Sequence, residues 1–239
     1  MTGAASGIGR AVAGALVDAG AQVLAVDLEP DADGPGEPFA ADLTTRAGNR
    51  AAVERALAAF GGLDTIVANA GFQHVAPVAE FDEDRWDALL ALLLTSPFLL
   101  ARYGWDALAA GGRGRFIAVA SAHGLVASPF KAGYVSAKHG VLGLVKTLAL
   151  EGADQGITAT AICPGFVRTP LVEGQIAAQA EAHDVPAEQV LEDVILAPHA
   201  LKRLIEPVEV AGAVLFLLGS SGAAFTGAPF VMDAGWTAR

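Results

Sequence analysis

Short apolar runs along the chain alternate with longer segments in which hydrophobic side chains recur at helical spacing. The short runs, which predict strands, cover residues 22–26, 39–43, 63–67, 115–120, 157–163 and 230–233. Helical patterns cover residues 8–18, 45–60, 82–105, 131–151 and 207–218, and residues 169–203 are polar and helical with a variable period. Apolar strands that alternate with helices predict a parallel sheet covered on both faces, which binds ligands at the carboxyl ends of its strands.

A glycine-rich turn, Gly3-Ala4-Ala5-Ser6-Gly7-Ile8-Gly9, lies at the start of the first helical pattern. Glycine lets the backbone approach a pyrophosphate closely, and the free N–H groups at a helix start favour phosphates. The next strand delivers Asp27, and an acid about twenty residues after such glycines is placed to bind an adenosine ribose. The alternative is a flexible loop with a helix N-cap at Ser6. The strand and Asp27 favour a dinucleotide site over that alternative.

Only Met1 and Thr2 precede the glycine turn, where a nucleotide-binding sheet needs a central, buried strand. Either the true start lies upstream of Met1, which we favour, or the sheet lacks its middle strand. The second case exposes two strand edges and a long apolar surface. We therefore expect one α/β domain over residues 1–239, a doubly wound parallel sheet of Rossmann type that lacks its first strand.

Composition narrows the class of protein. The 239 residues suffice for one large domain, and a hydrophobic share of 53% excludes disorder as the main state. The net charge of −11 argues against nucleic acid or an anionic membrane as a partner. Cys163 cannot form an internal disulfide, so we expect a buried core thiol in a reduced cytoplasm, and no secretory leader is evident. The longest apolar stretch, residues 88–101, contains Pro97 and is expected to be interrupted there and too short to span a bilayer.

Tyr134 and Lys138 stand four residues apart in a helical pattern and therefore share one helix face. A nearby ammonium lowers the pKa of a tyrosine from its ordinary value near ~10, so that the phenol can exchange a proton with an alcohol or a carbonyl. Ser121, at the end of a predicted strand, is placed to bond the same oxygen. Alone, the tyrosine–lysine pair is weak evidence, because chance and surface pairing explain most such pairs. Together with the nucleotide turn and Ser121 it predicts a catalytic site.

The chain resembles the short-chain dehydrogenase/reductases over essentially its whole length. The matching pieces are Thr2–Gly9, Asp42-Leu43, Asn69-Ala70-Gly71, Ser121, Tyr134-x-x-x-Lys138 and Pro164-Gly165-x-Val167-x-Thr169. The resemblance implies that Ser121 orients the substrate oxygen, Tyr134 is the acid/base, and Lys138 binds the nicotinamide ribose and lowers the tyrosine pKa. It implies cofactor contacts from Gly3, Ser6, Gly7, Ile8, Gly9, Asp27, Asp42, Leu43, Asn69, Ala70, Gly71, Tyr134, Lys138, Pro164, Gly165, Val167 and Thr169.

The cofactor is expected to be NAD rather than NADP. Asp27 would repel a 2′-phosphate while accepting a hydrogen bond from the 2′-hydroxyl. The turn also has no arginine before Gly7 that would bind such a phosphate.

Longer pieces resemble the bacterial D-3-hydroxybutyrate dehydrogenases more narrowly. They are residues 72–78, 121–128, 162–175 and 232–236. This resemblance implies that the substrate contacts come from Gln73, Ser121, His123, Lys131, Tyr134, Phe166, Gln175 and Trp236, with a covering helical segment around 169–203. It implies NAD-dependent interconversion of (R)-3-hydroxybutyrate and acetoacetate by a homotetramer. Taken singly, each residue favours a simpler interpretation: Lys131 as a surface residue, His123 as structural and Trp236 as core. Their joint occurrence in the matching pieces favours the substrate site.

The remaining histidines, His74, His139, His183 and His199, show no metal-ligand spacing, so no metal site is expected.

Two positions depart from the family pattern. Leu93 stands where the family has an asparagine that supports a proton relay, and we expect its return to asparagine to raise turnover unless Leu89, Leu90 and Leu94 accommodate the leucine. Phe166 replaces a tryptophan, which keeps an aromatic wall but enlarges the pocket. These departures leave two alternatives open: an oxidoreductase for another hydroxy acid or secondary alcohol, and a nucleotide-binding protein with little turnover.

Overall fold

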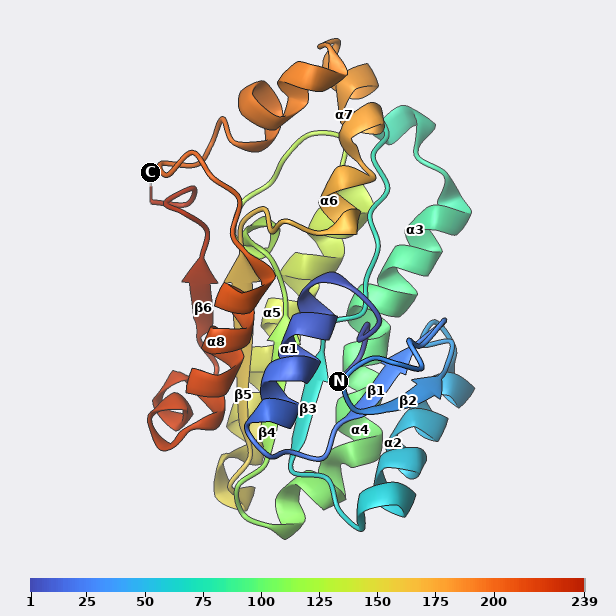
Figure 1. Cartoon of the computed structure of the whole chain (residues 1–239), viewed down its shortest axis with the longest axis vertical. Helices are drawn as coiled ribbons and strands as arrows, with labels where there is room; N and C mark the ends of the chain where they lie inside the picture. The colour runs from blue at the N-terminus through green and yellow to red at the C-terminus, as the bar shows by residue number, and fades with distance from the viewer. Residues whose placement is uncertain (239) are drawn as a thin grey trace.

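The computed structural model describes residues 1–238 and shows parallel strands between two layers of helices (Figure 1). Within those residues the strands are β1 (Leu24–Asp27), β2 (Glu37–Ala40), β3 (Thr65–Ala68), β4 (Arg115–Val119), β5 (Thr158–Pro164) and β6 (Pro229–Met232). Every pairing between them is parallel. The predicted Rossmann-like parallel sheet is therefore confirmed.

The sheet is divided where the first strand was expected to be missing. One part pairs β1 with β2, and the other has the order β3-β4-β5-β6. Met1 and Thr2 lie between the parts: Thr2 bridges Val26 in parallel on one side, and its N–H donates to the Val67 carbonyl (3.1 Å) on the other. Beside them, between β1 and β3, lies a mainly apolar cavity of 410 Å³.

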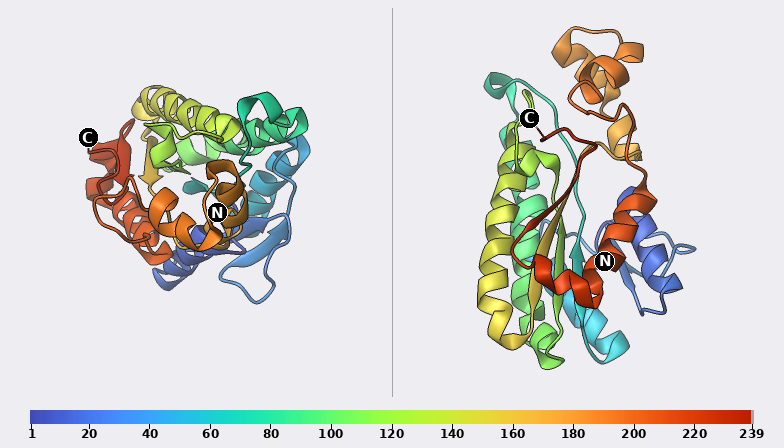
Figure 2. Two further views of the ribbon diagram at one scale, coloured as in Figure 1. Left: turned by 90° about the horizontal axis from the view of Figure 1, so that it is seen from above. Right: turned by 90° about the vertical axis from the view of Figure 1, so that its left-hand side faces the viewer.

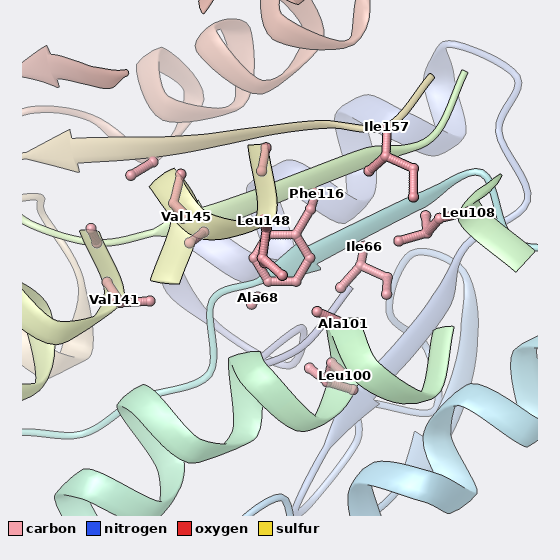
Figure 3. Packing of buried hydrophobic residues seen from close by; sticks show 14 of the residues in the cluster. Ile66, Ala68, Leu100, Ala101, Leu108, Phe116, Val141, Val145, Leu148 and Ile157 are labelled. Carbon is pink, nitrogen blue, oxygen red and sulfur yellow. The ribbon is translucent and has the colours of Figure 1, made fainter. Parts of the chain in front are cut away.

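Helices cover both faces of the sheet (Figure 2). On one face, α1 (Gly7–Asp18) packs against α8 (Pro207–Leu218) over a core that includes Val12, Ile162 and Val214. On the other lie α2 (Arg46–Phe60), α4 (Ser96–Ala110) and α5 (Ala132–Gly152). Figure 3 shows this second core, in which Phe116 of β4 lies among side chains of β3, α4 and α5. Both faces are apolar, as the continuous hydrophobic strands predict.

The helical pattern predicted to break at Pro97 is continuous. It consists of α3 (Glu83–Leu90), a π-helical turn (Ala91–Thr95) and α4, so the expected interruption is wrong. Pro97 lies in the first turn of α4, directly after the π turn, and the first turn is where a helix tolerates proline. The expectation that no apolar segment could span a bilayer is also wrong on length, because this helix has 28 residues. Since it packs against α2, β3 and α5, it is a core helix of this fold.

The segment after β5 forms α6 (Pro170–Glu173), α7 (Ile176–His183), a 3-10 turn (Ala187–Gln189) and a π turn (Val190–Ile195). It lies beyond the carboxyl ends of the strands, at the top of Figure 1. Further 3-10 turns cover Val78–Glu80, Ala122–Gly124, Ala153–Gln155 and Ser220–Phe225. The second predicted strand is shifted: β2 ends at Ala40, so residues 41–43 follow the strand and are not part of it.

Candidate active site

The glycine turn is folded as tightly as its sequence requires. Gly3 and Gly7 have φ of +64° and +52°, a region that side chains with a Cβ rarely adopt. A Cβ on Gly9 would lie 1.7 Å from the Gly3 carbonyl oxygen, so only glycine fits beneath the turn. Ser6 occupies the N-cap position of α1, but its side chain makes no capping bond. The first N–H groups of α1 are therefore directed at the cleft without a hydroxyl cap.

Asp27 is fixed beside this turn at the end of β1. Its carboxylate accepts hydrogen bonds from the backbone N–H groups of Ala5 (3.0 Å) and Leu28 (2.8 Å). A carboxylate next to the start of α1 is the arrangement predicted for a ribose-binding acid. Asp42 lies on the same cleft, and two hydrogen bonds from Thr44 hold its pKa below the usual range.

The cleft has a volume of 450 Å³ and is lined by most of the predicted cofactor residues. These are Gly3, Ser6, Gly7, Ile8, Asp27, Asp42, Leu43, Asn69, Ala70, Gly71 and Thr169. Pro164, Gly165, Val167 and Tyr134 line the adjoining smaller cavity, while Gly9 and Lys138 line neither. The sequence reasoning missed Leu28, Ala41, Thr44, Phe72, Leu92, Pro170 and Leu171, most of which adjoin a predicted residue.

Thr2 supports this cleft from below, a role that we did not predict. Its hydroxyl oxygen accepts hydrogen bonds from the backbone N–H groups of Asn69 (2.9 Å) and Ala70 (3.1 Å). The Asn69 amide in turn donates to the Thr2 carbonyl (3.0 Å). Thr2 therefore ties the loop after β3 to the glycine turn.

The three predicted catalytic residues meet where β4 ends beside α5. Ser121 follows β4, and its hydroxyl hydrogen-bonds Tyr134 and accepts from the His123 N–H (3.1 Å). The Lys138 Nζ lies 5.5 Å from the centroid of the Tyr134 ring and donates to the Val119 carbonyl (2.7 Å). The i, i+4 spacing on α5 therefore brings the phenol and the ammonium together as expected.

The protonation state of Tyr134 differs from the expectation. Burial raises the pKa of Tyr134 to about 12, and the bond from Ser121 opposes this only in part. Burial also lowers the pKa of Lys138 to about 8. Desolvation penalises the charged form of each group and is the largest cause of both shifts. Tyr134 thus holds its proton at neutral pH, ready to be donated.

Lys131 is a buried cation at the start of α5, with 2% of its surface exposed. It forms no ion pair with any acid among residues 1–238, and its Nζ lies 4.8 Å from the centroid of the Phe166 ring. Burial lowers the pKa of Lys131 to about 8, so the ammonium persists at neutral pH. The alternative of a surface lysine is therefore wrong. A buried cation without a protein carboxylate is suited to an anionic ligand.

Aromatic rings form the wall next to Lys131. Trp236 stacks on Phe166, with centroids 5.5 Å apart and planes 7° apart. The His123 ring meets Trp236 edge-on at 4.8 Å, and its Nε2 bonds the Ser128 hydroxyl (2.9 Å). Burial, followed by the charge of Lys131, lowers the pKa of His123 to about 3, so the imidazole is neutral.

All eight predicted substrate residues line one cavity of 100 Å³. They are Gln73, Ser121, His123, Lys131, Tyr134, Phe166, Gln175 and Trp236. The Gln73 side-chain oxygen accepts from the His74 N–H (3.0 Å), which leaves its amide hydrogens for the cavity. Val119, Ala120, Leu171 and Val172 also line it and were not predicted. Lys138 does not line the cavity, but its Nζ donates a hydrogen bond to the carbonyl of Val119, which does.

Leu93 occupies the π-helical turn and is buried in an apolar cluster with Leu89 and Ala137. Partly buried side chains, including Leu90, Leu94 and Tyr134, pack against this cluster. The leucine is therefore accommodated by its neighbours, as the alternative in the sequence analysis proposed.

The free cysteine and the remaining histidines pack against other side chains or the backbone and do not line the candidate site. Cys163 is free and buried in β5, as predicted. Within residues 1–238, no three side chains of His, Cys, Asp or Glu are grouped so that they could hold a metal ion. His74 and His183 lie edge-on to phenylalanine rings, and His199 is buried with its Nδ1 on the Arg203 carbonyl.

Comparison with known proteins agrees with this geometry. A family profile described as Enoyl-(Acyl carrier protein) reductase, from the short-chain dehydrogenase/reductases, matches residues 3–237. The D-beta-hydroxybutyrate dehydrogenase of Rhizobium meliloti (strain 1021) is 41% identical over 252 aligned residues, covering 100% of this chain and 98% of the relative. The enzyme of that name from Cupriavidus necator is 39% identical, covering 100% and 97%. The ligand-free aldohexose dehydrogenase of Thermoplasma acidophilum superposes with a TM-score of 0.90 at 26% identity, covering 100% and 92%.

Proposed function

Since the chain belongs to the short-chain dehydrogenase/reductase family, we propose that it interconverts (R)-3-hydroxybutyrate and acetoacetate with NAD. The observation that carries the proposal is the position of Lys131. This unpaired, buried ammonium lines the same small cavity as Ser121 and Tyr134. A substrate whose oxygen faces Tyr134 and whose carboxylate faces Lys131 is a short hydroxy acid.

The chain supplies binding, orientation and the proton. Gln73, His123 and Gln175 surround the carboxylate beside Lys131, and Trp236 and Phe166 pack against the methyl end. In reduction, Tyr134 donates its proton to the carbonyl oxygen, which Ser121 holds by a hydrogen bond. In oxidation the proton returns from the alcohol to the tyrosine oxygen, and the nearby Lys138 ammonium favours the phenolate that must receive it.

The glycine turn, Asp27 and the loop after β3 would hold the dinucleotide, because a Cβ at Gly3 or Gly9 would clash and α1 directs free N–H groups at the cleft. When bound, its nicotinamide accepts hydride from the alcohol carbon or returns it to the ketone. Asp27 supports NAD over NADP, since it would repel a 2′-phosphate. Equal kinetic efficiency with both cofactors would contradict this preference.

The deciding experiment compares (R)-3-hydroxybutyrate with butan-2-ol, which keeps the secondary alcohol and lacks the carboxylate. We expect the wild type to prefer the acid, and Lys131→Met to raise KM for the acid by about tenfold or more while KM for butan-2-ol is unchanged. Lys146→Met, an exposed position on the same helix, is the matched control. No turnover of the acid, or an equal effect on both substrates, overturns the proposal.

Two alternatives remain distinguishable by the same assay. Because Phe166 enlarges the pocket, one alternative substrate is a larger hydroxy acid, which would then be oxidised more efficiently than 3-hydroxybutyrate. Leu93 is the reason to consider a low-turnover nucleotide-binding protein, which would bind NADH without oxidising either alcohol.

We further propose a homotetramer in the cytoplasm. The family resemblance supports the first and the free thiol of Cys163 the second. Light scattering tests the assembly, and a solution mass near that of one chain, 24.2 kDa, would contradict it.

A further inference from the structure

Two glutamines lie one turn apart where α7 begins, above the candidate substrate cavity. Gln175 lines the cavity, whereas Gln179 does not line it and is almost fully buried, with 1% of its surface exposed. The Gln179 Nε2 donates to the Gln175 Oε1 (3.3 Å), and the Gln175 Nε2 donates to the backbone carbonyl of Leu171 (3.3 Å).

The Leu171 carbonyl fixes the direction of this chain of hydrogen bonds. A carbonyl only accepts, so the amide nitrogen of Gln175 must face it, and the Gln175 oxygen must face Gln179. That oxygen in turn needs a donor, so the Gln179 nitrogen must face it. Rotating either amide by half a turn would set two oxygens against each other.

The orientation matters for what Gln175 offers a ligand. An amide nitrogen carries two hydrogens, and one of those on Gln175 is used by Leu171. The other remains available to an acceptor in the cavity, which Lys131 also lines. With the amide reversed, Gln175 would offer an oxygen, which repels a carboxylate.

Gln179 is itself incompletely bonded. Its Oε1 is buried and has no hydrogen-bond partner among residues 1–238. A buried acceptor without a donor is unfavourable, so the Gln179 amide contributes little to stability by itself. Its observed bond holds the Gln175 amide from the oxygen side, as the Leu171 carbonyl does from the nitrogen side.

We propose that Gln179 is a positioning residue for carboxylate recognition: it holds the Gln175 amide with its N–H toward the cavity. The inference rests on the proposed function insofar as the ligand is a carboxylate. Gln179 acts through Gln175 and touches neither the substrate nor Tyr134.

The test uses acetate as the probe and the NADH complex of the whole protein, with affinity read by fluorescence titration. The carboxylate of Gln179→Glu can only accept a hydrogen bond, and the side chain of Gln179→Met can neither donate nor accept one. Both substitutions should therefore weaken acetate binding, by about tenfold for glutamate. With 3-hydroxybutyrate, KM should rise and kcat change little, while KM for butan-2-ol stays constant. NADH affinity and melting temperature show that the variants are folded.

A double-mutant cycle separates positioning from the added charge. In a Gln175→Met background, Gln179→Met should have no further effect on acetate affinity, because the amide it orients is absent. Gln189→Glu, exposed on the same covering segment, controls for charge and should leave the affinity unchanged.

Equal losses in both backgrounds, no loss in either, or a wild type that does not bind acetate each overturn the inference. A wild type that binds acetate and obeys the cycle but does not oxidise 3-hydroxybutyrate leaves the inference standing and overturns the proposed function instead.

Discussion

Two regions of the same parallel layer are built differently. One is at the carboxyl ends of β4 and β5, and the other is the junction of β1 with β3. At the first, β4 pairs with β5, and α5 places Tyr134 and Lys138 beside Ser121. At the second, a cavity of 410 Å³ replaces strand pairing, and the parts are joined through Met1 and Thr2.

The difference separates the effects of substitutions on catalytic rate from their effects on stability. Ser121 follows a paired strand, and Tyr134 and Lys138 lie on α5, so substitution of these catalytic groups should change rates and leave stability unchanged. In the nucleotide half, Thr2 is hydrogen-bonded to the loop after β3, so substitution of Thr2 should change stability and cofactor affinity together.

The strongest test of the catalytic end is Tyr134→Phe. Loss of a general acid/base costs about 10²–10⁴-fold in rate, and we expect this loss in kcat while NADH affinity and melting temperature stay near wild type. Tyr103→Phe, a tyrosine on α4 that lines neither candidate site, is the control. A Tyr134→Phe enzyme with near-normal turnover would remove the proposed acid/base from the mechanism.

The next effect is a pH dependence that only a carboxylate substrate should report. Because burial lowers the pKa of Lys131 to about 8, the ammonium is present below that pH and is lost above it. KM for 3-hydroxybutyrate should therefore rise above pH 8, approaching about tenfold per unit. Burial also lowers the pKa of Lys138, but titration of Lys138 affects both substrates. The KM for 3-hydroxybutyrate divided by the KM for butan-2-ol therefore reports the titration of Lys131. A flat ratio in the wild type would contradict the role of Lys131, and Lys131→Met should make it flat.

At the junction, Thr2→Val should weaken both folding and NADH binding. It removes the acceptor for the Asn69 and Ala70 N–H groups, and a buried unpaired donor costs about 1–3 kcal/mol. We expect a lower free energy of unfolding and a several-fold weaker NADH affinity, with kcat at saturation little changed. Thr2→Ser keeps the hydroxyl and should behave like the wild type. Unchanged stability in Thr2→Val would show that the junction does not depend on this hydroxyl.

Features set by local backbone geometry could be predicted from the sequence. Glycine spacing gives the turn, and the four-residue spacing of Tyr134 and Lys138 gives their shared helix face. Features set by contacts between distant segments could not. The π turn before Pro97 depends on packing against other elements, and the high pKa of Tyr134 depends on burial that no spacing encodes.

The role of Gln179 illustrates the same limit at the scale of one side chain. Nothing in the sequence distinguishes it from its neighbours on α7. Its role comes from its hydrogen bond to Gln175, whose amide is also bonded to the carbonyl of Leu171.

The smallest expected effect on catalysis comes from Leu93→Asn, next to Tyr134 at the catalytic end. The family pattern suggested that asparagine would raise turnover by completing a proton relay. The structure favours the other outcome, because Leu93 is 2% exposed and packs with Leu89 and Ala137. An amide buried there without a partner costs about 1–3 kcal/mol, so the melting temperature should fall with no gain in kcat.

Leu93→Met, which conserves apolar character and volume, is the control and should change both quantities little. A rise in kcat for Leu93→Asn at unchanged melting temperature would instead mean that the side-chain amide finds partners in the relay. It would also extend the comparison drawn above from the catalytic groups to their buried support, because a buried substitution at the catalytic end would then act on rate alone. A lower melting temperature at constant rate would place Leu93 with the supporting core and leave proton exchange to Tyr134, Ser121 and Lys138.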